Sequence, residues 1–245
     1  MLEKLDEIDW NSFSPHAGDL IPASIRALAS PNVDERRDAF SSGCHICDFE
    51  GVVYESTPIA VPFLLELLED RTTPEKDRIL ILLQVIADSV PDVVRLRDKV
   101  TKSLPTDSLL ARPIHWYVLA SYLAVEQGYA LYCRLLNDKE AALRIGAAFV
   151  LGRLINRRPD VSATLMQATE TERDNRVRAA FLLALMDLVE GLPEDDPVRQ
   201  SATLRFEDAF NEAISSAATV AEVSHSFGRI SKTQCSAFWS ERGTF

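Results

Sequence analysis

Apolar positions along this chain recur at helical spacing, and the pattern itself repeats. The segments "LRIGAAFVLGRLI" from Leu143 and "VRAAFLLALMDLV" from Val177 each place apolar residues three and seven positions after an arginine. Because these spacings put side chains on one stripe of a helix, each segment is predicted to be an amphipathic helix with a buried stripe. The same template recurs at intervals of 41, 34, 32 and 34 residues, and its five arginines are Arg37, Arg78, Arg112, Arg144 and Arg178.

A second predicted helix precedes each of these. "LIPASIRALAS" and "AVPFLLELLED" both carry a proline followed by apolar residues three and six positions later, and a proline in the first turn of a helix loses no internal hydrogen bond. The pattern therefore predicts helix pairs near 18–47, 58–89, 92–126, 128–156 and 160–190. It fades after residue 190, and residues 191–245 are predicted to form a C-terminal helical cap of the same domain.

Helix pairs with this period, and with the pattern D/N-x-x-x-x-R that Asn32 with Arg37 and Asp107 with Arg112 show, resemble the HEAT-repeat family. "LLNDKEAALRIGAAFVLGRLI" is similar to the family consensus, and "GVVYESTPIAVPFLLELL" looks like the repeat junction of bacterial HEAT-repeat domain-containing proteins. The resemblance covers roughly residues 18–190. It implies an all-α fold, a right-handed α-solenoid of about five helix pairs with a divergent cap, and usually protein binding. It implies no particular reaction, because a fold does not determine a function.

The resemblance also bears on the arginine column. In HEAT-like arrays such an arginine commonly pairs with an acid or a carbonyl of the neighbouring repeat, and the candidates here are Asp34, Asp77 and Asp138. A structural role is therefore predicted for the five arginines, and a ladder that binds a polyanion is the alternative.

Charge is unevenly distributed along the chain. Of the net −11, residues 1–70 carry −10, residues 71–186 carry +4 and residues 187–245 carry −5. Acidic ends repel nucleic acid and anionic lipid and favour a basic protein partner, although acidity also simply aids solubility. The longest apolar run, "ILILLQVIA", is too short for a membrane span, and the four cysteines do not suggest a disulfide framework. A cytoplasmic protein with no membrane partner is expected.

A Cys-x-x-Cys with an intervening histidine, Cys44, His45 and Cys47, is the one motif that suggests metal or redox chemistry. The repeat alignment places both cysteines in apolar columns, facing inward on one helical stripe, with His45 partly buried. Two further zinc ligands at suitable spacing are missing, so no metal and no cofactor are expected. His115 falls in an apolar column too and is interpreted as a packed core residue.

Enzyme classes built from similar repeats fit the sequence poorly. Iron-dependent hydroxylases of this kind carry paired His-Glu motifs, whereas the four histidines here are followed by Ala, Ile, Trp and Ser. Alkylbase DNA glycosylases need a basic concave surface, and only the central third of this chain is mildly basic. Since phosphate-binding loops, nucleophile elbows and zinc-protease helices are also missing from the sequence, we predict a protein that is not an enzyme.

The interval from Arg37 to Arg78 exceeds the others by about seven residues, and the surplus lies in "DFEGVVYEST". Aromatic residues flanked by acids suit a basic protein surface, and Trp116 could add an aromatic contact; the alternative is a structural loop whose Tyr54 packs on the next repeat. The predicted partner-binding residues are Asp48, Phe49, Glu50, Tyr54, Glu55 and Trp116.

These observations predict a non-enzymatic module that binds another, basic protein through an acidic surface. A bacterial immunity protein that neutralises a basic effector and a generic adaptor or assembly scaffold fit the sequence equally well. A HEAT-like nucleic-acid enzyme of the alkylbase DNA glycosylase type is the further alternative, and it predicts binding to damaged or single-stranded DNA.

Overall fold

The structure is a computed structural model, and it describes residues 2–14, 18–48, 52–89, 116–190 and 192–216. Within these ranges every element longer than a single bridge is a helix, which confirms the predicted all-α class. No described helix has the length and apolar character needed to cross a bilayer. The chain divides into two compact units, Met1–Leu154 and Ile155–Phe245, and each is considered separately below.

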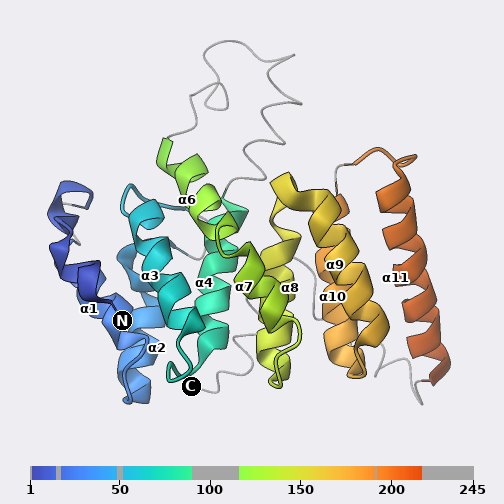
Figure 1. Cartoon of the computed structure of the whole chain (residues 1–245), viewed down its shortest axis with the longest axis horizontal. Helices are drawn as coiled ribbons and strands as arrows, with labels where there is room; N and C mark the ends of the chain where they lie inside the picture. The colour runs from blue at the N-terminus through green and yellow to red at the C-terminus, as the bar shows by residue number, and fades with distance from the viewer. Residues whose placement is uncertain (1, 15–17, 49–51, 90–115, 191, 217–245) are drawn as a thin grey trace, which may run out of the picture. The chain divides into compact units, whose positions relative to one another are not determined.

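The first unit contains both short and longer helices (Figure 1). Its described helices are the 3-10 helices η1 (Glu3–Glu7), η2 (Trp10–Ser12) and η3 (Gly43–His45) and the α-helices α1 (Leu20–Ala27), α2 (Val33–Ser41), α3 (Thr57–Glu69), α4 (Lys76–Asp88), α6 (Trp116–Glu126), α7 (Tyr129–Leu135) and α8 (Ala141–Gly152). The helix predicted at the start of the 92–126 pair lies outside the described residues, as do Arg112 and His115.

Polar side chains order two of the turns that precede these helices. The side-chain oxygen of Asn32 accepts a hydrogen bond from the backbone N–H of Asp34 at 2.9 Å, and Asp138 does the same for Glu140 at 2.9 Å. Asn32 is the N-cap of α2, and its oxygen satisfies one of the N–H groups that a helix leaves without an internal partner. Asp138 instead orders the turn before α8, whose N-cap residue is Glu140.

Helices α3 and α6–α7 run side by side in the same direction. A side chain at Gly128 would meet Leu65 of α3, since a Cβ built there lies 2.7 Å from Leu65 Cδ2. Further along both helices, Arg134 Nη2 of α7 lies 2.7 Å from Glu69 Oε1 of α3. Because later residues of α3 meet later residues of α6–α7, the two neighbours are parallel.

Helices α4 and α8 form a second parallel pair. Leu80 of α4 touches α8 so closely that a Cβ on Gly146 would lie 2.9 Å from Leu80 Cδ1. Near the ends of both helices, Arg153 Nε lies 2.8 Å from Asp88 Oδ1, and the arginine is buried. Thus α3 with α6–α7 forms one row of parallel helices, and α4 with α8 forms a second row. In each row the C-terminal ends of the two neighbours lie together.

Helix α6 packs most extensively on α3, and its buried side differs from the one that the arginine template predicts. Tyr122 and Val125 are fully buried, whereas Leu119 is 48% exposed. The prediction that Leu119 belongs to the buried stripe is therefore wrong. Helix α6 carries apolar residues on every side, so its sequence does not indicate which side faces the core.

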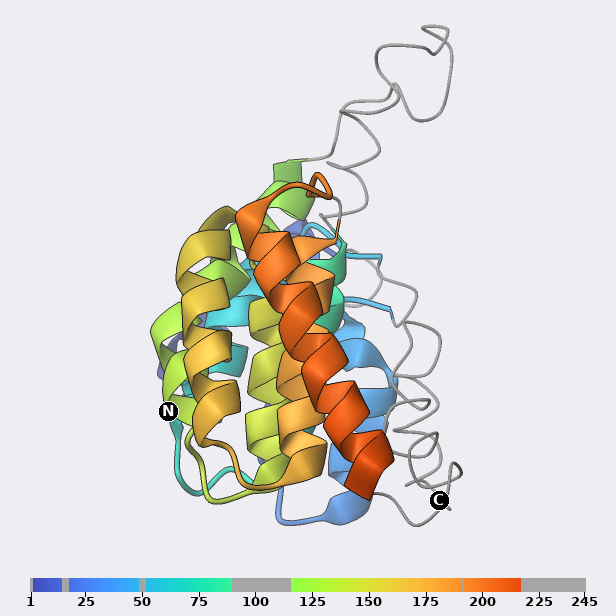
Figure 2. The same ribbon diagram turned by 90° about the vertical axis from the view of Figure 1, so that its right-hand side faces the viewer.

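The second unit comprises η5 (Ile155–Arg157), α9 (Arg158–Thr171), α10 (Asn175–Val189) and α11 (Pro197–Ser216). Helix α10 packs against both α9 and α11, as Figure 2 shows. Phe181, Leu185 and Leu188 of α10 are buried, as the repeat pattern predicts. Asp174 caps α10 by accepting a hydrogen bond from the N–H of Arg176 at 2.9 Å, as Asn32 does for α2.

Candidate functional site

The Cys-x-x-Cys motif begins in the short segment η3, which has left-handed backbone angles and does not continue α2. Helix α2 ends at Ser41, and Gly43, Cys44 and His45 all have positive φ angles of 57°, 53° and 59°. An α-helix needs negative φ angles, so these three residues cannot continue α2. The prediction that both cysteines extend a helical stripe is wrong in its geometry, although both thiols are buried and His45 is half-buried.

The surroundings of the two thiols keep them protonated. Burial raises the pKa of Cys47 to about 12, with the charge of Asp48 adding to the effect, and burial also raises the pKa of Cys44. Since the thiolate is the form that attacks disulfides and binds metals, neither group is activated. Within the ranges described above, no three His, Cys, Asp or Glu side chains are grouped so that they could hold a metal ion. The cysteines contribute here as small apolar residues of the core.

The segment that follows is fixed at both ends. Asp48 N–H donates to Val52 O at 3.0 Å, Asp48 Oδ1 accepts from Val52 N–H at 2.9 Å, and Cys47 pairs with Val53 in an isolated antiparallel bridge. Thr57 Oγ1 accepts from Tyr54 N–H at 2.8 Å and donates to Ile46 O. We call Asp48 together with residues 52–56 the acidic loop.

The acidic loop presents part of the predicted binding set. Tyr54 is 40% exposed and Glu55 is exposed, while Asp48 is half-buried and holds the loop together. Burial raises the pKa of the Tyr54 hydroxyl, and Asp48 adds to this, so the hydroxyl stays neutral and can donate a hydrogen bond. Phe49 and Glu50 lie outside the described residues.

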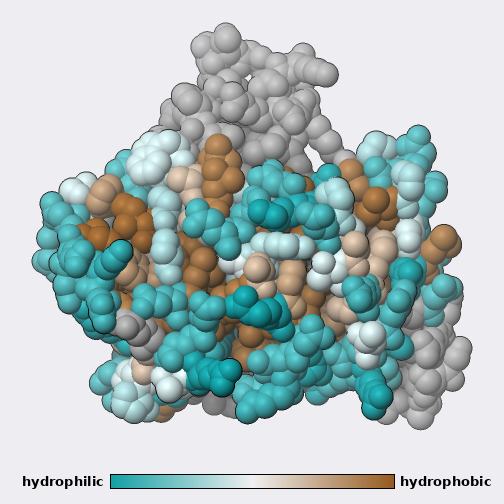
Figure 3. Space-filling model, viewed as in Figure 1, coloured by the Kyte–Doolittle hydropathy of each residue, from teal (hydrophilic) through white to brown (hydrophobic). Residues whose placement is uncertain are grey.

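The exposed side of α6 is apolar. Trp116 is 58% exposed, Leu119 48% and Leu123 44%, and no residue from Trp116 to Val125 is charged. We call these three side chains the α6 stripe, and Figure 3 shows hydrophobic side chains at the surface over this helix. The predicted residue Trp116 belongs to the stripe; Leu119 and Leu123 were missed because the repeat template assigned the face of α6 incorrectly. The missed signal is the run of ten residues without a charge, from Trp116 to Val125.

The acidic loop and the start of the α6 stripe lie at the same end of their row of helices. The contact of Leu65 with Gly128 sets the register between α3 and α6. Eight residues before each of these positions stand Thr57, the first residue of α3, and Ala120 in the second turn of α6. The loop that leads into α3, with Tyr54, is therefore level with the first turn of α6.

Two arginines make the same local contact, and one of them is not in the predicted column. Arg144 Nη1 donates to the carbonyl oxygen of Asp138, six residues earlier, at 2.8 Å. Arg36 Nη1 donates to the carbonyl oxygen of Ser30, also six residues earlier, at 2.7 Å. Arg36, rather than the predicted Arg37, is therefore the equivalent of Arg144.

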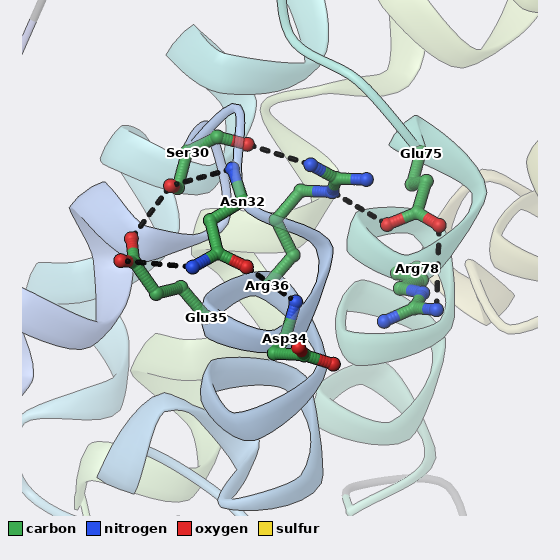
Figure 4. Close-up of polar contacts among 7 residues, drawn as sticks. All are labelled: Ser30, Asn32, Asp34, Glu35, Arg36, Glu75 and Arg78. Atoms are coloured by element: carbon green, nitrogen blue, oxygen red, sulfur yellow. Dashed lines mark hydrogen bonds and ion pairs between the residues drawn. The ribbon is translucent and has the colours of Figure 1, made fainter. Parts of the chain in front are cut away.

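Arg36 also connects two helix pairs (Figure 4). Its Nε donates to Glu75 Oε2 at 2.6 Å, and Arg78 Nη2 lies 3.4 Å from the other oxygen of the same carboxylate. The guanidinium of Arg78 in turn lies 5.7 Å from the centre of the Phe40 ring. A single carboxylate between two arginines thus holds α2 against the start of α4.

The remaining column arginines have varied surroundings. Arg37 contacts Asp34 at 3.0 Å within one helix, so this contact with a predicted candidate does not bridge repeats. Arg178 is half-buried in α10. Arg134 forms an ion pair with Glu69, and Arg153 forms one with Asp88. Both ion pairs connect helices, and neither Arg134 nor Arg153 belongs to the predicted arginine column. No periodic signal in the sequence could have identified them.

Glu194, Asp195 and Asp196 are consecutive acidic residues, and they lie in a turn before α11. Asp196 Oδ1 accepts a hydrogen bond from Val198 N–H at 2.8 Å and so caps that helix. This segment therefore has a structural function and adds nothing to the candidate surface.

The candidate surface of the first unit thus consists of the α6 stripe and the acidic loop. A comparison of the chain with protein-family models, with curated proteins and with solved structures gives no match in any of the three. The resemblance to the HEAT-repeat family stays a prediction from the repeat pattern.

Proposed function

We propose that this protein binds another protein without catalysis, through the α6 stripe and the acidic loop. The observation that carries the proposal is the exposure of Trp116, Leu119 and Leu123 on a helix with no charged residue between Trp116 and Val125. A helix that is apolar on all sides is normally covered on all sides, and contiguous exposed apolar side chains mark interaction sites. Tryptophan and tyrosine are also the side chains that most often anchor interfaces.

Charge supports a basic partner. Glu55 is exposed beside Tyr54, and the first 70 residues carry a net charge of −10. Opposite charges around an apolar centre speed association and exclude wrong partners more than they add affinity. Neutralisation of a basic effector by an immunity-type protein and client binding by an adaptor are the two forms of this function that we propose.

The packing of the first unit supports a HEAT-like scaffold behind this surface. Parallel neighbours, α3 with α6–α7 and α4 with α8, are the relation that stacked helix pairs have in a solenoid. In such a scaffold the binding surface belongs to the rows of helices and their junctions, which is where the α6 stripe and the acidic loop lie.

The test is affinity capture from an extract of the source cells, followed by mass spectrometry and by reconstitution with the purified partner. We expect the wild-type chain to retain a protein that Trp116→Ser loses by about tenfold or more. Leu204→Ser is the matched control, because Leu204 is 61% exposed on α11, away from the α6 stripe in sequence and in the other unit. Retention of the same proteins by all three chains would contradict the proposal.

A further inference from the structure

We draw no further inference here: the strongest candidate, the exposed apolar face that Trp116, Leu119 and Leu123 form on α6, belongs to the surface already proposed to bind a protein, and nothing in the described part of the structure shows what covers it.

Discussion

Two adjacent arginines in "DERRDAF" have different environments although they look equivalent in the sequence. Arg36 is 11% exposed and contacts Glu75 and the carbonyl oxygen of Ser30, whereas the side chain of Arg37 is 40% exposed beside Asp34. The sequence template chose Arg37 because Phe40 follows it by three residues. The structure favours Arg36 because only that position lets the guanidinium reach back to the turn and across to α4.

We therefore expect Arg36→Ala to lower the free energy of unfolding by about 1–3 kcal/mol, since it leaves the carbonyl oxygen of Ser30 and the Glu75 carboxylate without this donor. Arg37→Ala is the matched control, and we expect it to cost about 0.5 kcal/mol or less, as exposed ion pairs do. Urea denaturation of the two variants measures both values. Equal costs would contradict the assignment of Arg36 as the repeat arginine.

The cysteines show how a correct prediction of burial can rest on the wrong geometry. Apolar columns at helical spacing predicted that Cys44 and Cys47 face inward, and both do. Helical periodicity carries no information on the sign of φ, so the left-handed turn at residues 43–45 could not be read from it. Gly43 alone is a residue type that favours such a turn.

At the scale of elements, the helices could be located from the sequence far better than they could be oriented. Residues 116–126 form a helix, but its exposed side includes Leu119, which the template placed in the core. In a helix with polar residues on one side, the sequence indicates which side faces solvent. From Trp116 to Val125, the polar groups of α6 are limited to Ser121 and the tyrosine hydroxyls, so its sequence does not indicate this. Its packing against α3 decided which apolar residues were left at the surface.

The contact between α4 and α8 depends on the absence of a side chain at Gly146. We expect Gly146→Ala to lower the free energy of unfolding by about 1–2 kcal/mol, because the added methyl would lie 2.9 Å from Leu80 Cδ1 and force the helices apart. At a helix position without this contact, the same change would stabilise the protein by about 1 kcal/mol.

A double-mutant cycle separates the two effects. In the Leu80→Ala background the space opposite Gly146 is open, so we expect the added methyl to cost little or to stabilise. Thermal and urea unfolding of the four chains provide the coupling between the two positions. If Gly146→Ala stabilises the wild-type chain, the close approach of α4 and α8 is contradicted.

At the scale of the whole molecule, the chain contains two compact units where the sequence predicted one domain with a cap. The first unit ends at Leu154, after α8, and the second begins at Ile155, before α9. The 34-residue interval between Arg144 and Arg178 continues across this boundary, so the repeat pattern gives no sign of it. Contacts, rather than period, define a compact unit.

A compact unit with its own core is expected to fold when it is produced alone. We expect a fragment of residues 1–154 to show a helical circular dichroism spectrum and one cooperative thermal transition. A spectrum without a cooperative transition would mean that the first unit depends on the rest of the chain for its stability. The full chain measured in the same buffer is the control.

The sequence by itself determined the all-α class, the approximate places of most described helices and the burial of the second-unit core residues Phe181, Leu185 and Leu188. These follow from the three- and four-residue spacing of apolar side chains, which is a local property. Tertiary structure decided which side of α6 stays exposed, which of two arginines spans from α2 to α4, and that Cys44 lies in a left-handed turn. Each of these depends on what lies opposite a residue in space, and a pattern along one chain does not contain that information.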